Sequence, residues 1–239
     1  MIFYYVRHGD PIYDPDSLTP LGHEQAKALS KRFAMYGLDE IYASTSMRAQ
    51  MTAEPTCKIL GKEMTLLDWT NEGHTWRDFC VPREDGSYSW CFHQDKIVEK
   101  FHSPEIRAMG NSWHEHPDFK NLPFSEGVKR INRETDAFML SLGYKHDREN
   151  SRYEIVKQNN KRVALFAHQG FGLAFLSNLL DIPYPTFCTR FDFGHSSVTV
   201  IHFSDAEEGY TYPKVFQLSN DSHLYKEGKL TGYNNSIDI

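Results

Sequence analysis

The feature that most constrains the fold of this 239-residue chain is the alternation of short apolar runs with longer amphipathic segments. Apolar runs of strand length occur at residues 2–6 (IFYYV) and 163–167 (VALFA), and the segments that follow them carry helix signals. Strands that alternate with helices are typical of a parallel sheet. The sequence therefore predicts an α/β fold, a mostly parallel sheet with helices on both faces.

The predicted elements have recognisable boundaries. Thr19 followed by Pro20 predicts the start of a helix that runs to Tyr36 and ends at Gly37. By the same criteria we predict further strands at 40–43, 64–67, 197–203 and 214–218, and further helices at 47–60, 128–142 and 172–180.

Residues 73–124 depart from this alternation because they are rich in Trp, His, Pro and Gly. Insertions after the carboxyl ends of strands overhang the site that forms at that edge of an α/β sheet. We therefore predict a single domain over 1–239 with a helical or irregular cap insertion at about 73–124. The alternative is an insertion that packs on itself and takes no part in chemistry.

Composition argues against several classes of partner. With a net charge of -6, the chain lacks the excess of Lys and Arg with which proteins bind nucleic acid or an anionic membrane surface. No apolar run approaches the ~18 residues of a membrane span, and the first residues are needed for a strand rather than a signal peptide. The four cysteines form no CxxC pair, which predicts reduced thiols. We expect a cytoplasmic protein with no nucleic-acid or membrane partner.

Two of the predicted strands end in a histidine. The strand at 2–6 continues into Arg7 and His8, and the strand at 163–167 continues into His168. The carboxyl ends of parallel strands lie at the same edge of a sheet, where the sites of α/β proteins form. The sequence therefore predicts that the two imidazoles lie close together.

Two arginines are expected at the same edge. Arg7 precedes His8, and Arg48 lies in the first turn of the helix after the strand at 40–43. Guanidinium groups match phosphate oxygens with paired hydrogen bonds. Positive charge lowers the pKa of a neighbouring histidine. A neutral imidazole can act as a nucleophile when a backbone carbonyl, here in the turn at Gly9, holds its other ring nitrogen. The cluster favours a phosphoryl ligand.

Four motifs carry a family resemblance: VRHGD at 6–10, LTPLGHEQA at 18–26, STSMRAQMTAE at 44–54 and FAHQG at 166–170. In this order they resemble the histidine phosphatase superfamily, the phosphoglycerate mutase-like α/β enzymes. The resemblance implies that His8 becomes phosphorylated, that Arg7 and Arg48 bind the phosphoryl group, and that His168 donates to its oxygens. Gln169, directly after His168, is a further phosphate-binding candidate.

The family also needs a carboxyl group that protonates the leaving oxygen, and in the family this group lies a little after the third strand. Asp68 and Glu72 both occur there, in LLDWTNEG. Glu72 is the favoured alternative, because relatives commonly place a glutamate at that point. It would act as acid in the first half-reaction and as base toward water in the second.

The resemblance implies a phosphatase that acts on small phosphate monoesters, without metal or organic cofactor, and whose partner is a phosphorylated small molecule. The segment DPIYDPDS at 10–17 carries three aspartates that would repel a second phosphate, which argues against a mutase. A phosphoglycerate mutase-like phosphotransferase and a catalytically inactive phospho-ligand binding module remain alternatives. The oligomeric state is open, with a homodimer as one alternative.

Other histidines are predicted to be structural. His23 lies within the first predicted helix, and His223 lies near the C-terminal end of the sequence. His114 and His116 flank Glu115 but have no identifiable third ligand, so no metal site is expected there.

Overall fold

The computed structural model describes residues 1–205 and 208–229. By its internal contacts the chain divides into two compact units. Unit 1 contains residues 1–71, 158–169 and the segment from 193 onward, and unit 2 contains residues 72–157 and 170–192. Each unit is described by itself.

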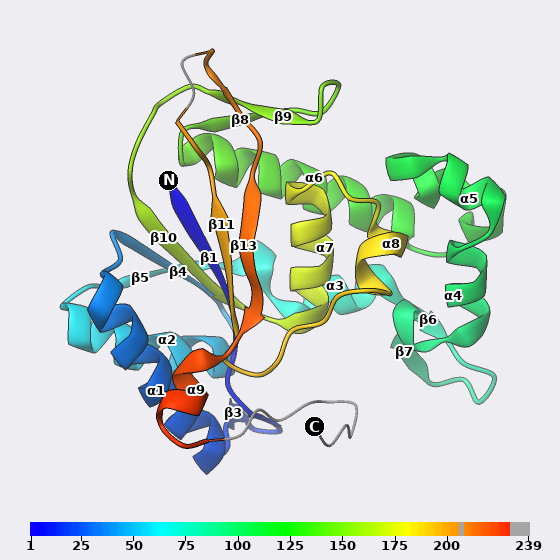
Figure 1. Ribbon diagram of the computed structural model, residues 1–239. Coiled ribbons are helices and arrows are strands. Elements are labelled where there is room, and N and C mark those ends of the chain that lie inside the picture. Colours follow the sequence, from blue (N-terminus) through cyan, green and yellow to red (C-terminus); the bar gives the residue numbers. More distant parts are fainter. Residues whose placement is uncertain (206–207, 230–239) are drawn as a thin grey trace. The chain divides into compact units, whose positions relative to one another are not determined.

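A six-stranded sheet forms the centre of unit 1 (Figure 1). Its order is β13 (Lys214–Asn220), β11 (Val198–His202), β1 (Ile2–Arg7), β10 (Arg162–Ala167), β4 (Glu40–Ser44) and β5 (Met64–Leu67). The pairs β1–β10, β10–β4 and β4–β5 are parallel, whereas β11 runs antiparallel to both β1 and β13. The sheet is therefore mixed but mostly parallel and is flanked by helices, which confirms the predicted fold class.

Two helices of unit 1, α1 (Pro20–Tyr36) and α2 (Met47–Leu60), begin and end close to the predicted residues. A short helix, α9 (Ser222–Lys226), was not predicted. The Thr19 hydroxyl caps α1 by accepting from the Gly22 N–H at 3.1 Å. Two short strands, β2 (Pro11–Tyr13) and β3 (Asp16–Leu18), form a hairpin between β1 and α1, and a further strand, β12, spans Tyr210–Thr211.

Alternate side chains of the central strands face α1 and α2. Tyr4 of β1 and Phe166 of β10 pack with Phe33 of α1 in one buried cluster, and the rings of Tyr4 and Phe33 meet edge-on at 5.3 Å. The intervening side chains, such as Phe3 and Leu165, are also buried. Burial of both sets explains why these strands are apolar without interruption.

Unit 2 contains the stretch that the sequence predicts to be helical or irregular. Its helices are α3 (Glu72–Phe79), α4 (Asp95–Phe101), α5 (Pro104–Ala108), α6 (Phe124–Ser141), α7 (Gln169–Leu179, whose first residue belongs to unit 1) and α8 (Tyr184–Cys188). Its hairpins are β6–β7 (Cys80–Pro82, Tyr88–Trp90) and β8–β9 (Tyr144–Asp147, Arg152–Ile155). Buried rings of Phe101, Trp113 and Phe124 form its core.

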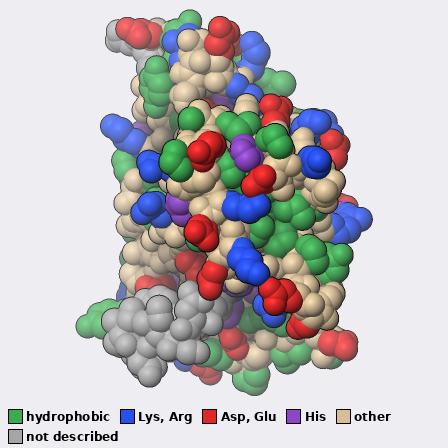
Figure 2. All heavy atoms as spheres, turned by 90° about the vertical axis from the view of Figure 1, so that its right-hand side faces the viewer, with side chains coloured by type: hydrophobic (Ala, Val, Ile, Leu, Met, Phe, Trp, Pro, Cys, Tyr) green, Lys and Arg blue, Asp and Glu red, His purple; other side chains and the backbone are tan. Residues whose placement is uncertain are grey.

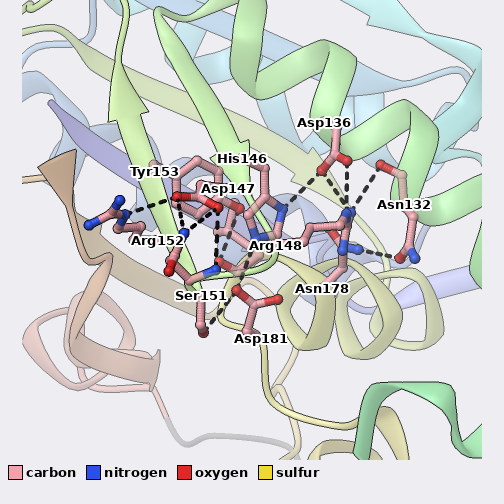
Figure 3. Close-up of polar contacts among 12 residues, drawn as sticks. Asn132, Asp136, His146, Asp147, Arg148, Ser151, Arg152, Tyr153, Asn178 and Asp181 are labelled. Atoms are coloured by element: carbon pink, nitrogen blue, oxygen red, sulfur yellow. Dashed lines mark hydrogen bonds and ion pairs between the residues drawn. The ribbon is translucent and has the colours of Figure 1, made fainter.

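A partly buried charged cluster holds the β8–β9 hairpin in unit 2 (Figure 3). The two ring nitrogens of His146 lie 3.0 Å from Asp136 of α6 and 2.9 Å from Asp181, which follows α7. Burial lowers the pKa of His146, but the hydrogen bonds to the two carboxylates outweigh it and leave that pKa raised. The Arg148 guanidinium also donates to Asp136, at 2.7 and 3.0 Å.

The four cysteines are free and buried. Burial raises the pKa of each thiol: Cys57 in unit 1, and Cys80, Cys91 and Cys188 in unit 2. Within the described residues, no helix is both long and apolar enough to span a membrane. On the face in Figure 2, Lys and Arg side chains are interspersed with Asp and Glu, and hydrophobic patches lie between them.

Candidate active site

The two predicted histidines meet at the carboxyl ends of β1 and β10. Arg7 pairs with Ala167 in the parallel register, so His8 and His168 are the next residues of neighbouring strands. Their ring centroids lie 5.3 Å apart, edge-on, and the His8 N–H donates to the Ala167 carbonyl at 2.9 Å. Both side chains are buried. The sheet thus brings together two imidazoles that are far apart in the sequence.

The turn after His8 packs tightly against the start of α1. A Cβ atom on Gly9 would lie 2.8 Å from the Gly22 carbonyl oxygen, and one on Gly22 would lie closer still to the Asp10 carbonyl oxygen, at 2.2 Å. The Gly9 N–H donates to Thr52 Oγ1 of α2 at 2.9 Å. The backbone therefore requires both glycines, and the turn is attached to both helices.

The surroundings of His8 define its protonation. Nδ1 lies 2.7 Å from the Gly9 carbonyl oxygen, which can only accept, so Nδ1 carries the proton and Nε2 carries the lone pair. Burial, followed by the neighbouring His168 and the positive charge of Arg7, holds the pKa of His8 well below its usual range. His8 is therefore a neutral imidazole near pH 7, the state that a nucleophile needs.

His168 is held through its backbone and its ring. Its N–H lies 3.2 Å from the Tyr5 hydroxyl, which in turn donates to the His168 carbonyl. Its Nε2 lies 2.8 Å from Ser44 Oγ at the end of β4. Burial and the charges of Arg48 and Arg7 hold the pKa of His168 well below its usual value. A bound phosphate would counter these charges and raise that pKa.

Arg48 lies near the start of α2, as predicted, and is buried. Its guanidinium donates to Asp16 at 2.7 Å and lies 5.3 Å from the centre of the Tyr13 ring. Both partners belong to the β2–β3 hairpin. Asp16 also accepts from the Met47 N–H at 2.8 Å. This acid of the DPIYDPDS segment therefore positions a phosphate-binding candidate, a role that the sequence analysis did not assign to it.

The sequence analysis missed His195. Its Nε2 lies 3.0 Å from an Arg7 nitrogen, its Nδ1 lies 3.3 Å from Asp10, and its ring centroid lies 5.7 Å from that of His8. A guanidinium can only donate, so Nε2 accepts and the proton lies on Nδ1, facing the carboxylate. Burial and Arg7 lower the pKa of His195 to about 4. Arg7 also donates to the Phe193 carbonyl.

The position of His195 could have been predicted from the direction of the strand that follows it. It comes three residues before β11, which pairs antiparallel with β1. The start of an antiparallel strand lies at the same edge as the end of its neighbour. A sequence interpretation that treats all strands as parallel puts this segment at the opposite edge.

The remaining candidates lie at the starts of helices. Gln169 is the half-buried first residue of α7. Glu72 is the first residue of α3 in unit 2, where its Oε1 accepts from the Gly170 N–H at 3.0 Å. The alternative acid, Asp68, is exposed in unit 1 and accepts from Thr45 Oγ1 at 3.1 Å.

The other histidines have structural contacts. His23 is exposed on α1, and the buried His223 lies 3.1 Å from Ser196 Oγ through Nε2. His114 packs on Trp113, and His116 caps a short turn through the Asp118 N–H at 3.3 Å. Across residues 1–205 and 208–229, no three His, Cys, Asp or Glu residues form a group that could hold a metal ion.

Comparison with known proteins matches these features to one family. Residues 3–76 match the histidine phosphatase superfamily (branch 1), and this segment contains Arg7, His8, Arg48 and Glu72. A curated relative, "Putative phosphoserine phosphatase 2" of Hydrogenobacter thermophilus, is 23% identical over 155 residues, which is 60% of this chain and 67% of the relative.

Solved structures share the fold. A phosphoserine phosphatase from Entamoeba histolytica in complex with 3-phosphoglyceric acid has a TM-score of 0.58 at 18% identity and covers 93% of this chain and 98% of its own. A mycobacterial glucosyl-3-phosphoglycerate phosphatase with VO3 has a TM-score of 0.56 at 16% identity, covering 90% and 97%. The matched segment and the order of its motifs are thus similar to those of the histidine phosphatase superfamily, and the fold is similar to that of these phosphatases.

Proposed function

We propose that this protein is a phosphatase that hydrolyses small phosphate monoesters through a phosphohistidine on His8. The observation that carries the proposal is the neutral His8, whose Nδ1 is held by the Gly9 carbonyl and whose ring lies beside His168. The similarity to phosphoserine phosphatases and to a glucosyl-3-phosphoglycerate phosphatase supports the reaction class.

In this proposal the arginines bind the phosphoryl oxygens. Arg7 and Arg48 are buried and lower the pKa of both histidines, which reflects a site that favours negative charge. His168 would donate to a phosphoryl oxygen, and Gln169 would add an amide donor. The neutralisation of charge is assigned to guanidinium groups, so we expect hydrolysis to survive chelation of divalent metals.

The first step forms the phosphoenzyme. The lone pair of His8 Nε2 attacks phosphorus, and the ester P–O bond breaks with its electron pair on the leaving oxygen. That oxygen takes the proton of the Glu72 carboxyl group, so a neutral alcohol departs.

The second step restores the enzyme. Water attacks the phosphorus atom and gives a proton to the Glu72 carboxylate, while the P–N bond breaks with its electron pair on Nε2. The products are inorganic phosphate and neutral His8. A mutase-like phosphotransferase would use a second alcohol in place of water, and an inactive binding module would carry out neither step.

The nucleophile is tested by His8→Ala with labelled substrate. We expect no turnover of any ester and no labelled enzyme, whereas His23→Ala, a change at an exposed histidine of α1, keeps full activity. Vanadate should inhibit the native enzyme, because it mimics the five-coordinate phosphoryl group. Retention of label by His8→Ala would overturn the assignment.

The acid is tested by Glu72→Gln. An alkyl ester needs protonation of its leaving oxygen, so its hydrolysis should fall by roughly 10²-fold or more. An aryl ester with an acidic phenol should lose less in the first step, and phosphoenzyme should accumulate. If Glu72→Gln instead lost equal activity on both esters and accumulated no phosphoenzyme, Glu72 would not be the acid. If Asp68→Asn then showed the larger loss on the alkyl ester and accumulated phosphoenzyme, Asp68 would be the acid.

A further inference from the structure

Unit 2 contains a groove of about 450 Å³ between α3, the β6–β7 hairpin and the segment before α6. Its lining includes Trp76, Arg77, Pro82, Tyr88, Leu122 and Pro123. Trp76 is 41% exposed and Tyr88 60% exposed, so two large aromatic side chains border the groove in contact with solvent. The volume falls within the range of roughly 300–1,000 Å³ that is typical of small-molecule pockets.

The groove is connected to Glu72 along α3. Trp76 lies four residues after Glu72, and residues four apart share one face of a helix, about one turn of 5.4 Å from each other. Cys80, the first residue of β6, also lines the groove. Glu72 therefore lies on the same face of α3 as Trp76, which lines the groove.

Trp90 forms a second connection between Glu72 and the groove. A Cβ atom on Gly170 would lie closer than 3.0 Å to both the Trp90 ring and Glu72 Oε1, so these two side chains flank the same glycine. The Trp90 ring meets the Trp76 ring edge-on at 5.1 Å. Within unit 2, Glu72 and Trp90 thus flank Gly170, and Trp90 in turn meets Trp76.

We propose that this groove binds a planar, aromatic leaving group of the phosphate monoester. This inference rests on the proposed function, in which Glu72 protonates the leaving oxygen. The leaving group is covalently attached to that oxygen, so it extends away from Glu72. The Trp90–Trp76 wall and the groove provide an apolar surface one helical turn from that carboxyl group. Arg77 adds a charged donor to a mostly apolar lining.

An aromatic ring suits this lining better than a sugar or a short polar chain. Exposed Trp and Tyr faces gain most by covering an aromatic partner, in offset or edge-on geometry. Removal of one phenyl ring's worth of apolar surface from water favours binding by roughly 10- to 100-fold.

The test compares 2-phenylethyl phosphate with ethyl phosphate. Both release a primary alcohol, so both need the same protonation by Glu72 and they differ in the ring alone. We expect Trp76→Ala and Tyr88→Ala each to reduce kcat/KM for the phenylethyl ester by roughly 10-fold or more, mainly through KM. For ethyl phosphate the change should stay within about threefold. Trp76→Phe, which keeps a ring, should restore most of the difference.

Tyr212→Ala is the matched control, because Tyr212 is also 60% exposed but belongs to unit 1. It should leave both esters unchanged. Equal effects of the Trp76 and Tyr88 changes on both esters, or no effect on either, would overturn the groove assignment while the phosphatase proposal stands.

A phosphate-free probe separates the two proposals. Saturation-transfer NMR should detect 2-phenylethanol on the native protein and lose the signal in Trp76→Ala. If the native protein hydrolyses no ester at all, the proposed function fails, and the alcohol still reports whether the groove binds an aromatic ring. Binding of the alcohol that is equal in the native protein and in Trp76→Ala would contradict the groove.

Discussion

Arg7 is fixed on one side by an uncharged histidine. His195 accepts from the guanidinium through Nε2, and its Nδ1 lies 3.3 Å from an Asp10 oxygen, so the ring lies between the phosphate-binding candidate and a carboxylate. Because the pKa of His195 is lowered to about 4, the ring keeps one protonation state throughout the neutral range.

Replacing His195 should therefore weaken anion binding without changing the pH profile. In His195→Leu the Arg7 guanidinium loses an acceptor, and a hydrogen bond to a charged group contributes about 1.5–3 kcal/mol. We expect kcat/KM and vanadate affinity to fall together by about 10- to 100-fold, while His195→Asn, whose amide oxygen can accept, retains more of both. A shift of the pH optimum in His195→Leu would show instead that His195 titrates during turnover.

Asp16 should position Arg48 in the way that His195 positions Arg7. Asp16→Ala removes the carboxylate at 2.7 Å from the guanidinium, so the arginine loses its fixed orientation. We expect about a 10-fold rise in the KM of small monoesters. Asp14→Ala is a matched control, because Asp14 is an exposed acid of the same segment. Equal effects of the two changes on KM would mean that the hairpin contributes only through its net charge.

The site residues that follow the central strands were predictable because the carboxyl ends of parallel buried strands all lie at the same edge of the sheet. His8 and His168 follow from apolar runs that end in basic side chains, Arg48 follows from the helix that begins after the strand at 40–43, and the structure brings the two histidines together. His195 depends on the antiparallel direction of β11, which the local sequence does not encode. Asp16 depends on a hairpin whose three-residue strands are too short to show a pattern.

At the scale of elements, the β8–β9 hairpin depends on the charge of His146. Asp136 of α6 and Asp181 after α7 face its two ring nitrogens, Arg148 shares Asp136, and Tyr153 of β9 stacks on the ring at 4.4 Å. The imidazolium thus connects the hairpin to the ends of two helices.

The contribution of His146 to stability should depend on pH. Its pKa is raised in the folded chain, so the folded state binds the proton more tightly than the unfolded state. The stabilisation is fully present below the unfolded pKa of about 6.5 and is lost as pH rises through the folded pKa. We expect His146→Gln to reduce the free energy of unfolding by about 1.5–3 kcal/mol at pH 6 and by less at pH 9, measured by urea denaturation.

Lys145→Gln is the control for this measurement. Lys145 pairs with Glu154 on the exposed side of the same hairpin, at 3.0 Å. Surface pairs contribute about 0–1 kcal/mol, so its loss should be small at both pH values. A destabilisation by His146→Gln that is constant from pH 6 to 9 would show that the ring acts by packing alone.

Elements with strong local signals were predicted well, and those held by distant contacts were not. The helix α1 has a capping threonine, both α1 and α2 end at a glycine, and their bounds match the predictions. The hairpins β2–β3 and β8–β9 were missed, because the ion pairs at Arg48 and His146 that hold them join segments remote in sequence.

For the whole molecule, the histidines whose pKa is lowered by burial share one response to acid. Burial is the largest cause that lowers the pKa of His8, His168, His195 and His223, the last to about 3. Below pH 6.5 the unfolded chain takes up protons that the folded chain does not, so the free energy of unfolding falls as pH falls. Each histidine adds up to about 1.4 kcal/mol per pH unit to this slope.

Denaturation in urea at pH 7.5, 6.0 and 5.0 should show this loss. In His195→Asn the slope should be smaller by the share of one histidine, since its proton uptake on unfolding is absent. A free energy of unfolding that is the same at pH 7.5 and 5.0 would contradict the neutral state assigned to these imidazoles. His146 acts in the opposite direction and reduces the observed slope.

The rate at which the buried thiols are alkylated should measure local opening of the chain. Alkylation requires an ionised, accessible sulfur, and all four thiols are buried with raised pKa values. Cys57 reports on unit 1, while Cys80, Cys91 and Cys188 report on unit 2. Pulsed labelling followed by peptide mass spectrometry should therefore resolve the opening rates of the two units without an introduced probe. Vanadate should slow the labelling of Cys57 if the anion binds at His8.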